Sequence, residues 1–152
     1  MPELKERKEC TEEYFFSEIY KAVKMGADAI INLLPAIKDD RLRSVMTLQL
    51  DGYEKYAARA AAALAERGQS AKEENLFTRL SAKMGSAVST LIDSSAGHIA
   101  EMMIGSSNMT ITDMTRLQNL HLKNGTASDA VRLAGEVIEF EMHNLDMLKR
   151  YL

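Results

Sequence analysis

The fold is decided near the N-terminus by residues 11–35, which read TEEYFFSEIYKAVKMGADAIINLLP. Thr11 followed by two glutamates is typical of a helix start, because a threonine side chain caps free backbone N–H groups and acidic residues stabilise the first turn. Pro35 has no backbone N–H, so we expect the helix to end just before it or to kink there. One helical face of this stretch is apolar throughout: Phe16, Ile19, Val23, Ala27, Ile30 and Leu34.

A second and a third helix follow the same pattern. Asp39 and Asp40 are predicted to cap the second helix, and Gly68 is predicted to stop it. Its inward face is Leu42, Val45, Met46, Gln49, Tyr53, Tyr56, Ala60, Ala63 and Leu64. The third helix is predicted to start at Ser70. Its inward face is Leu76, Leu80, Met84, Ala87, Leu91, His98 and Met102.

The last third of the chain contains two interruptions. Residues 105–108 are predicted to form a loop, with a helix resuming at Thr110 or Thr112. Residues 123–125, Lys-Asn-Gly, are typical of a helix stop, and Ser128 is predicted to cap the final helical run. We therefore count four long helices, the fourth broken or bent near Gly125. Its final apolar face is Ala134, Ile138, Glu141, Leu145, Leu148 and Leu152.

Length and composition agree with an all-α fold. The chain has 152 residues, of which only 8 are glycine and 2 are proline, too few for the turns of a β protein. We expect a single helical-bundle domain over 1–152, in which 1–10 form a charged and mobile tail. Because the connections at 38–40 and 68–71 are short, the prediction is an up-down-up-down antiparallel four-helix bundle.

The charge balance limits the partners. Lys and Arg number 19 and Asp and Glu number 22, so the net charge is −3 and a nucleic-acid surface is disfavoured. No run approaches the ~18 apolar residues of a membrane span, and the first residues are too charged for a signal peptide. A lone cysteine, Cys10, cannot form an intramolecular disulfide. The expected location is the cytoplasm.

No phosphate-binding glycine motif, CxxC or HExxH is present. The informative residues are instead polar side chains on apolar helix faces, because a buried polar group is costly unless it is compensated. These residues are Gln49, His98, Glu141 and, less clearly, Asn144. For Glu141 we favour a structural partner across the core, an Arg or a Tyr. Tyr53 and Tyr56 are expected to pack with hydroxyl partners.

Two stretches of the sequence carry a resemblance to a known family. The first is Met102-Met103-Ile104-Gly105-Ser106-Ser107-Asn108-Met109, and the second, at the end of the last helix, is Glu139-Phe140-Glu141-Met142-His143-Asn144-Leu145. Together with the four-helix pattern over about residues 12–151, these stretches resemble the ferritin-like superfamily, including spore-coat-related members from Firmicutes. The resemblance implies a ferritin-like bundle. In that family the chemistry resides in a dimetal centre, built from a Glu on each of two helices and Glu-x-x-His on the other two.

The ligand motifs of that centre are missing here. No Glu-x-x-His occurs, and the positions three residues before His98, His121 and His143 hold Ser95, Gln118 and Phe140. Where the family has its ligands, the second helix reads Gln49-x-x-Gly52 and the fourth reads Glu141-x-x-Asn144. On the first helix, Ala27 lies on the inward face and Asp28 lies at the margin of that face. Counting residues along the predicted helices also separates Gln49 from Glu141 by about 10 Å or more along the bundle axis.

Three functions are compatible with these residues. The first is a structural or protein-interaction scaffold without a dimetal centre, without enzymatic activity and without a cofactor. The second is a metal-binding oxidase or store with non-standard ligands drawn from Asp28, Gln49, His98, Glu101 and Glu141. The third is a small-molecule binder that uses a gap left between helices by Gly26, Gly52 and Gly85.

Association is expected from two further features. The second helix carries seven alanines between residues 57 and 65, which permit close approach of a neighbour. The last helix has a second apolar line, Leu133, Phe140 and Met147, which favours either a partner or packing under the loop at 105–111. The prediction is a homo-oligomer, a dimer. Met102, Met103, Met109 and Met114 are expected to fill gaps at the bundle end, with a contact surface or copper(I) as alternatives.

Overall fold

The computed structural model describes residues 11–71, 94–123 and 128–152, and that part of the chain contains four long helices and no strand. The helices are α2 (Glu12–Leu33), α3 (Asp40–Glu66), α5 (Ala96–Lys123) and α6 (Asp129–Lys149), with a 3-10 turn, η1 (Leu34–Ala36), after α2. The all-α four-helix prediction is confirmed. The predicted tail 1–10, the helical face from Leu76 to Leu91 and the stop residue Gly125 lie outside the described residues.

The predicted helix starts are confirmed by their capping bonds. Thr11 Oγ1 accepts a hydrogen bond from the Tyr14 N–H at 3.2 Å, and Asp39 Oδ1 accepts one from the Leu42 N–H at 2.9 Å. Ser128 Oγ accepts from the Val131 N–H at 3.3 Å in the same way. Each side chain satisfies a backbone donor that the first turn of a helix leaves free.

The predicted ends of the first two helices are also confirmed. α2 ends at Leu33, and the chain tightens into η1 with Pro35 inside it. α3 ends at Glu66, two residues before Gly68, which has φ +71° and thus the left-handed backbone that glycine adopts most readily. Arg67 then bonds Glu12 at 2.9 Å, which ties the end of α3 to the start of α2.

The helix boundaries after residue 70 differ from the prediction. α5 runs without a break through residues 105–108, so the predicted loop, and the restart at Thr110 or Thr112, are wrong. A single exposed glycine costs a helix only about 1 kcal/mol, and the buried side chains of Met103, Ser107 and Met114 continue the inward face across it. α5 and α6 are separate helices on either side of residues 124–127, where the prediction has the last helix broken or bent near Gly125.

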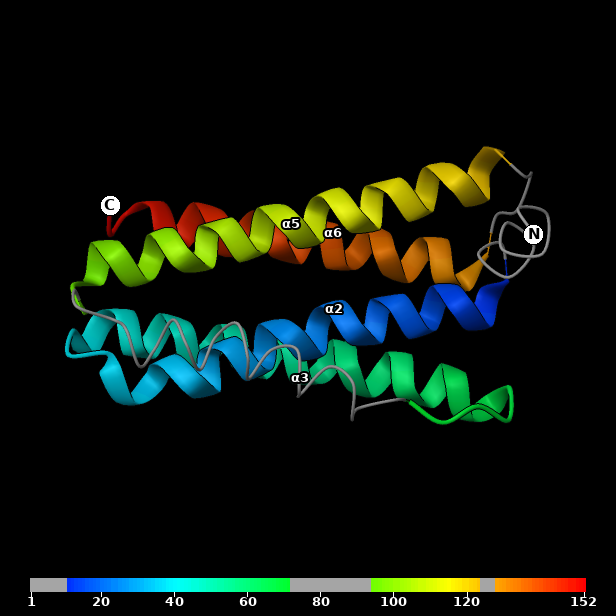
Figure 1. The fold of residues 1–152 in the computed structure, drawn as a ribbon, viewed down its shortest axis with the longest axis horizontal. Coiled ribbons are helices and arrows are strands. Elements are labelled where there is room, and N and C mark those ends of the chain that lie inside the picture. Colours follow the sequence, from blue (N-terminus) through cyan, green and yellow to red (C-terminus); the bar gives the residue numbers. More distant parts are fainter. Residues whose placement is uncertain (1–10, 72–93, 124–127) are drawn as a thin grey trace, which may run out of the picture.

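The four helices form two antiparallel hairpins, α2–α3 and α5–α6, packed side by side (Figure 1). Helices that are neighbours around the bundle run antiparallel, as expected. In chain order, however, α3 and α5 run in the same direction, so the end of α3 and the start of α5 lie at opposite ends of the bundle (Figure 1). The connection at 68–71, which we expected to reverse the chain, leads into residues 72–93, which lie outside the described residues.

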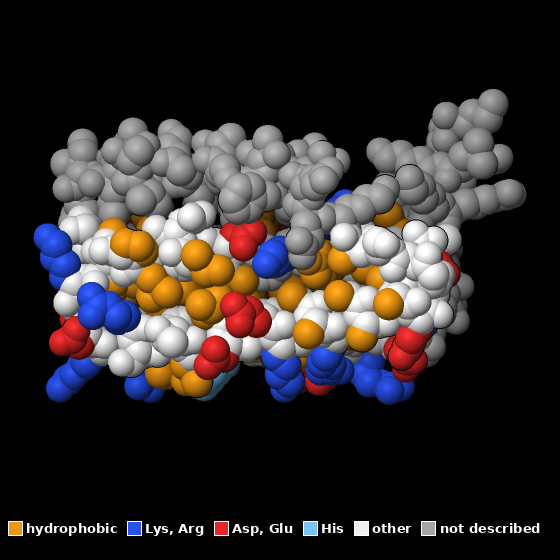
Figure 2. Space-filling model, turned by 90° about the horizontal axis from the view of Figure 1, so that it is seen from below, with side chains coloured by type: hydrophobic (Ala, Val, Ile, Leu, Met, Phe, Trp, Pro, Cys, Tyr) orange, Lys and Arg blue, Asp and Glu red, His pale blue; other side chains and the backbone are white. Residues whose placement is uncertain are grey.

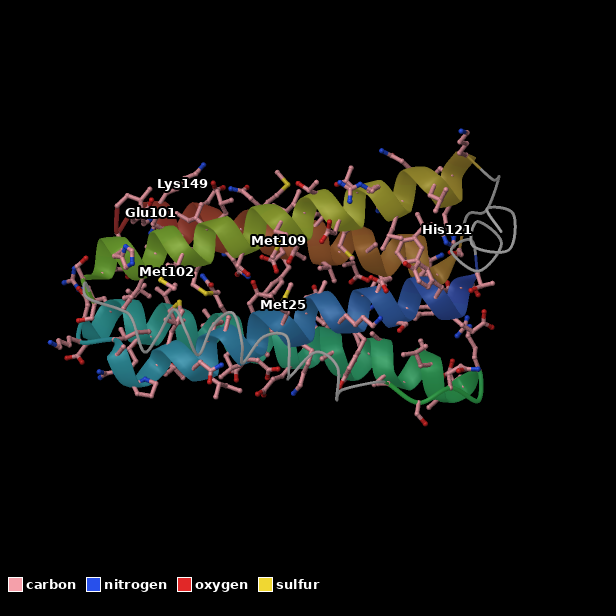
Figure 3. All side chains as sticks on the ribbon, viewed as in Figure 1. Met25, Glu101, Met102, Met109, His121 and Lys149 are labelled. Carbon is pink, nitrogen blue, oxygen red and sulfur yellow. The ribbon has the colours of Figure 1, made fainter. Side chains whose placement is uncertain are left out.

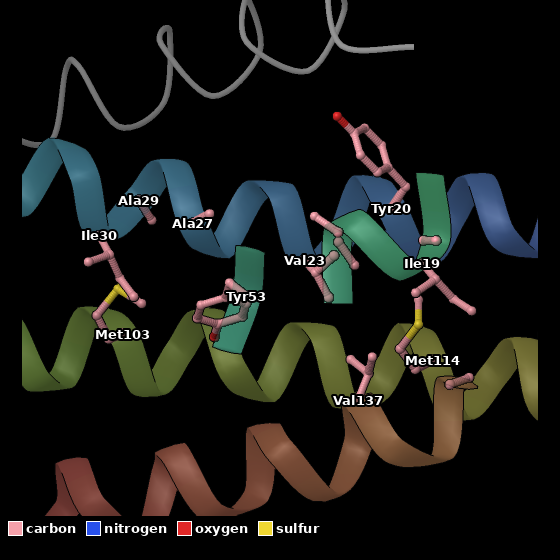
Figure 4. Packing of buried hydrophobic residues seen from close by; sticks show 14 of the residues in the cluster. Ile19, Tyr20, Val23, Ala27, Ala29, Ile30, Tyr53, Met103, Met114 and Val137 are labelled. Atoms are coloured by element: carbon pink, nitrogen blue, oxygen red, sulfur yellow. The ribbon is translucent and has the colours of Figure 1, made fainter. Parts of the chain in front are cut away.

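The core fills the space between the two hairpins. Figure 4 shows Met103 beside Ile30 and Met114 beside Ile19, so these two methionines link α5 to α2. Both are buried, as the gap-filling interpretation expected, whereas Met102 is half-buried and Met109 is 47% exposed. The methionines predicted to form one cluster are therefore divided between the core and the face formed by α2 and α5, where Met25 also lies (Figure 3).

The second apolar line of α6 packs inside the bundle. Leu133 is buried, and the Phe140 ring contacts the rings of Tyr53 and Tyr56 on α3, with centroid distances of 5.0 and 5.2 Å. Phe140 also lies against the backbone of Gly52. These two side chains thus have packing partners within the chain. The alternative of packing under a loop at 105–111 is wrong, because α5 is continuous there.

Candidate functional site

A cluster of polar side chains lies inside the bundle where α3, α5 and α6 meet. Its members come from three helices and are at most 4% exposed: Gln49, Tyr53, Ser107, Glu141 and Asn144. We refer to these five residues as the polar cluster. Their burial is notable because each side chain carries groups that prefer water unless they find hydrogen-bond partners.

The central contact of the polar cluster joins the two hairpins. The Tyr53 hydroxyl on α3 donates a hydrogen bond to Glu141 Oε2 on α6 at 2.9 Å. Glu141 has no exposed surface and Tyr53 is 1% exposed. The sequence-based expectation that Glu141 pairs with an Arg or a Tyr across the core is confirmed, with Tyr53 as the partner.

A second bond spans the same two helices. Gln49 Nε2 donates to the backbone oxygen of Asn144 at 3.4 Å. Gln49 and Tyr53 are one turn apart on α3, and Glu141 and Asn144 are one turn apart on α6, so the two bonds lie on successive turns. The predicted axial separation of Gln49 from Glu141 is therefore wrong, because it was counted along helices whose boundaries after residue 70 were misplaced.

Two glycines make room for the rings beside the polar cluster. A Cβ atom on Gly26 of α2 would overlap the Tyr53 ring, and a Cβ atom on Gly52 would overlap the Phe140 ring. Figure 4 shows Tyr53 close to α2 with its hydroxyl directed away from that helix. The gap that a small-molecule binder was expected to use at Gly26 and Gly52 is thus filled by side chains of this chain, and Gly85 lies outside the described residues.

The electrostatics of Glu141 follow from its burial. Removal from water raises the pKa of Glu141 from its usual 4.5 to about 7, while the hydroxyl groups of Ser107 and Tyr53 act in the opposite direction. The pKa of Tyr53 is raised well above its ordinary value, first by burial and then by the nearby Glu141 carboxyl. Near neutral pH, Tyr53 is therefore a hydrogen-bond donor, and burial favours the protonated form of Glu141 relative to an exposed glutamate.

Several atoms of the polar cluster have no hydrogen-bond partner within residues 11–71, 94–123 and 128–152. They are Gln49 Oε1, Ser107 Oγ, Glu141 Oε1 and Asn144 Nδ2. Buried polar atoms in this condition usually bind an ordered water molecule or rearrange when a proton or an ion arrives. The polar cluster is therefore the part of the described core where a change in hydration or protonation has the largest effect.

The remaining predicted ligands do not join the polar cluster. Asp28 forms an ion pair with Lys24 on the same helix at 3.8 Å, and it is Gly26 that faces Tyr53. His98 and Glu101 lie near the start of α5. His98 precedes Ser107 by nine residues, about 13 Å along the helix axis. Of the five candidate ligands, only Gln49 and Glu141 are brought together.

The donor set of the polar cluster does not fit a ferritin-like dimetal centre. Such a centre needs several carboxylates and two imidazoles, whereas the polar cluster contains one carboxyl group, whose Oε2 accepts from Tyr53. Across residues 11–71, 94–123 and 128–152, no three His, Cys, Asp or Glu side chains are grouped closely enough to hold a metal ion.

Three buried polar residues are not among the sequence-based candidates: Ser107, Thr110 and His121. Ser107 was assigned to a loop, although its spacing from Met103 and Met114 continues the inward face of α5. His121, near the end of α5 (Figure 3), is 1% exposed and packs edge-on against the Phe15 ring, with a centroid distance of 4.5 Å. Its spacing of seven residues from Met114 was the available signal.

No protein-family model and no curated protein matches this chain. Among the helices that are described, none is long and apolar enough to cross a membrane.

Proposed function

We propose that this chain is a ferritin-like bundle that acts in the cytoplasm as a structural or protein-interaction scaffold, without a dimetal oxidase centre. The helix order supports the ferritin-like assignment. In ferritin-like folds one connection traverses the bundle, so that the second and third helices of the bundle run in parallel. Among the described helices, α3 and α5 run in the same direction, as the helices on either side of such a connection do (Figure 1).

The observation that carries the proposal is the Tyr53–Glu141 hydrogen bond at 2.9 Å. It stands within the bundle interior, where a dimetal protein needs carboxylates from several helices. Here a tyrosine hydroxyl, a serine and two amides surround a single carboxyl group. These groups suit a hydrogen-bonded core better than a centre that binds two cations.

The surface most suited to self-association is the outer face of the α2–α3 hairpin. Figure 2 shows hydrophobic side chains gathered along this face, and Ile31 and Leu48 are 48% and 68% exposed. A shallow groove with a largely alanine floor follows the seam between the two helices: Tyr20, Lys24, Ala27, Glu54, Ala57, Ala58 and Ala61. Small side chains allow the helix of a second copy to approach closely, and symmetric dimers are the commonest assemblies.

A metal titration tests the absence of the dimetal centre. The melting temperature of the whole chain is measured with and without Fe²⁺ or Mn²⁺, for the wild type and for Glu141→Gln. We expect neither metal to raise the melting temperature of either protein. A rise of several degrees in the wild type that Glu141→Gln abolishes would overturn the proposal, since a ligand that binds only the folded state stabilises it.

Sedimentation velocity tests the dimer. We expect the wild type to sediment as a dimer and Ile31→Glu and Ala58→Arg to sediment as monomers, because a charge or a long side chain on this face blocks close approach. Met142→Glu is the matched control, because Met142 is 55% exposed on α6. A monomeric wild type, or a control that dissociates equally, would show that this face does not mediate a dimer.

A further inference from the structure

We propose that the interface between the α2–α3 and α5–α6 hairpins is a pH-sensitive switch, in which protonated Glu141 closes the interface and ionised Glu141 loosens it. The inference does not depend on the scaffold function. It rests on three features: where Glu141 lies, what surrounds it, and which of its atoms lack partners.

Glu141 lies on the contact between the hairpins. Its bond with Tyr53 and the bond between Gln49 and Asn144 both connect α3 to α6 inside the bundle. A third contact of the same helices, the Arg59–Glu136 ion pair at 2.8 Å, is at the surface. Any rearrangement that hydrates Glu141 therefore acts on the two internal bonds that join the hairpins.

Among the described residues, the groups around Glu141 include no positive charge. α3 presents the Tyr53 hydroxyl and the Gln49 amide, α5 presents Ser107, and α6 itself adds Asn144. α2 presents Gly26 and apolar side chains at this level, while its Lys24 and Asp28 pair with each other. Arg59 is bound to Glu136 through both carboxylate oxygens. Tyr53 is thus the one titratable group that faces Glu141 within the described residues.

The unpartnered atoms explain why the proton matters. A protonated carboxyl group gains an O–H donor, and Gln49 Oε1 is a buried acceptor without a partner among the described residues. An ionised carboxylate loses that donor and faces no cation, so it needs water. Because Glu141 has no exposed surface, bulk water reaches it only if the packed helices around it separate.

The direction of the pH effect follows from the raised pKa. The pKa of Glu141 is 4.5 when exposed and about 7 when buried in the folded chain. The stability contributed by the closed site is therefore complete below pH 4.5 and is lost as the pH rises through 7. For a difference of this size, the unfolding equilibrium constant should increase on the order of a hundredfold between pH 5 and pH 8.5.

Urea unfolding of the whole chain between pH 5 and pH 8.5 tests the switch. We expect Glu141→Gln to remove that increase, because glutamine accepts from Tyr53 and carries no charge. The matched control is Glu139→Gln, which changes an exposed glutamate on the same helix and should retain the wild-type pH profile. The proposal would be overturned if the stability of Glu141→Gln fell with pH as steeply as that of the wild type. It would also be overturned if the stability of the wild type did not change between pH 5 and pH 8.5.

Two measurements on the wild type keep the proposal falsifiable if Glu141→Gln does not fold. Carbon-13 NMR of labelled glutamate should show one carboxyl group that titrates near pH 7. If all glutamate carboxyl groups titrate near pH 4–5, the proposal is contradicted. Hydrogen exchange, corrected for its intrinsic pH dependence, should accelerate at interior amides of α3 and α6 between pH 5 and pH 8.5. Unchanged corrected rates would mean that the interface does not open.

Discussion

The hydroxyl group of Tyr53 and the carboxyl group of Glu141, 88 residues apart in the chain, form a buried hydrogen bond of 2.9 Å between the two helix hairpins. The other carboxyl oxygen, Glu141 Oε1, has no hydrogen-bond partner among the described residues. The bond is therefore a point at which stability, protonation and helix packing depend on one another.

Tyr53→Phe should destabilise the chain by about 1–3 kcal/mol, since it leaves a buried carboxyl group without its donor. The loss of that donor should also raise the pKa of Glu141 further, so the fall in stability should move to higher pH. Urea unfolding at several pH values measures both effects. Tyr56→Phe is the control, because Tyr56 is half-buried, and it should change stability by under about 0.5 kcal/mol. Equal losses for the two variants would mean that the Tyr53 hydroxyl bond contributes nothing specific.

Gly26→Ala should destabilise the chain by about 1–3 kcal/mol, although alanine is the better helix former. The new methyl group overlaps the Tyr53 ring, which is packed on all sides and cannot move away without strain. Thermal unfolding gives the size of the loss. The matched control is Gly105→Ala, where open space surrounds the added atom, and it should stabilise α5 by about 0.5–1 kcal/mol. A Gly26→Ala protein as stable as Gly105→Ala would refute this account of the site.

Phe140→Ala should destabilise the chain by about 2–4 kcal/mol, because its ring contacts Tyr53, Tyr56 and the Gly52 backbone. Denaturant unfolding measures the change. Met142→Ala, on the exposed side of the same helix, should change stability by under about 0.5 kcal/mol. If Phe140→Ala is as mild as this control, the second apolar line of α6 does not pack on α3 as described.

Thr11→Ala should destabilise the chain by about 1 kcal/mol, because it removes the acceptor for the Tyr14 N–H at the start of α2. The loss is measured by thermal unfolding and should be largely restored by Thr11→Ser, which keeps the hydroxyl group. Thr115→Ala, at an exposed position inside α5, is the control and should be close to neutral. Failure of serine to restore stability would indicate that the cap does not act through its hydroxyl.

Local signals predicted the first half of the chain well. The capping residues Thr11 and Asp39, the break at Pro35 and the stop at Gly68 act within one helical turn, so their effect can be read without knowing the fold. The same reasoning failed at residues 105–108, where a glycine, two serines and an asparagine suggested a loop. There, tertiary packing of Met103, Ser107 and Met114 outweighs weak local preferences.

Polar residues on apolar helix faces were the right candidates for the site, but the sequence could not predict which of them lie together. Gln49 and Glu141 were singled out because burial of such groups requires compensation. His98 satisfied the same criterion, yet it lies half-buried near the start of α5, away from the polar cluster. Which of these residues meet depends on how far each helix slides along its neighbours, and a shift of one turn moves a side chain by about 5 Å.

The sequence by itself determined the helical class, the capped helix starts and the choice of Glu141 as an inward carboxyl group, because these depend on contacts within a few residues. Only the tertiary structure decided that α3 and α5 run in the same direction, that the glycine gaps are filled by aromatic rings, and that Tyr53 is the partner of Glu141. These features depend on relative helix positions. Such positions are set by side-chain packing between residues far apart in the chain, for which local periodicity carries no information.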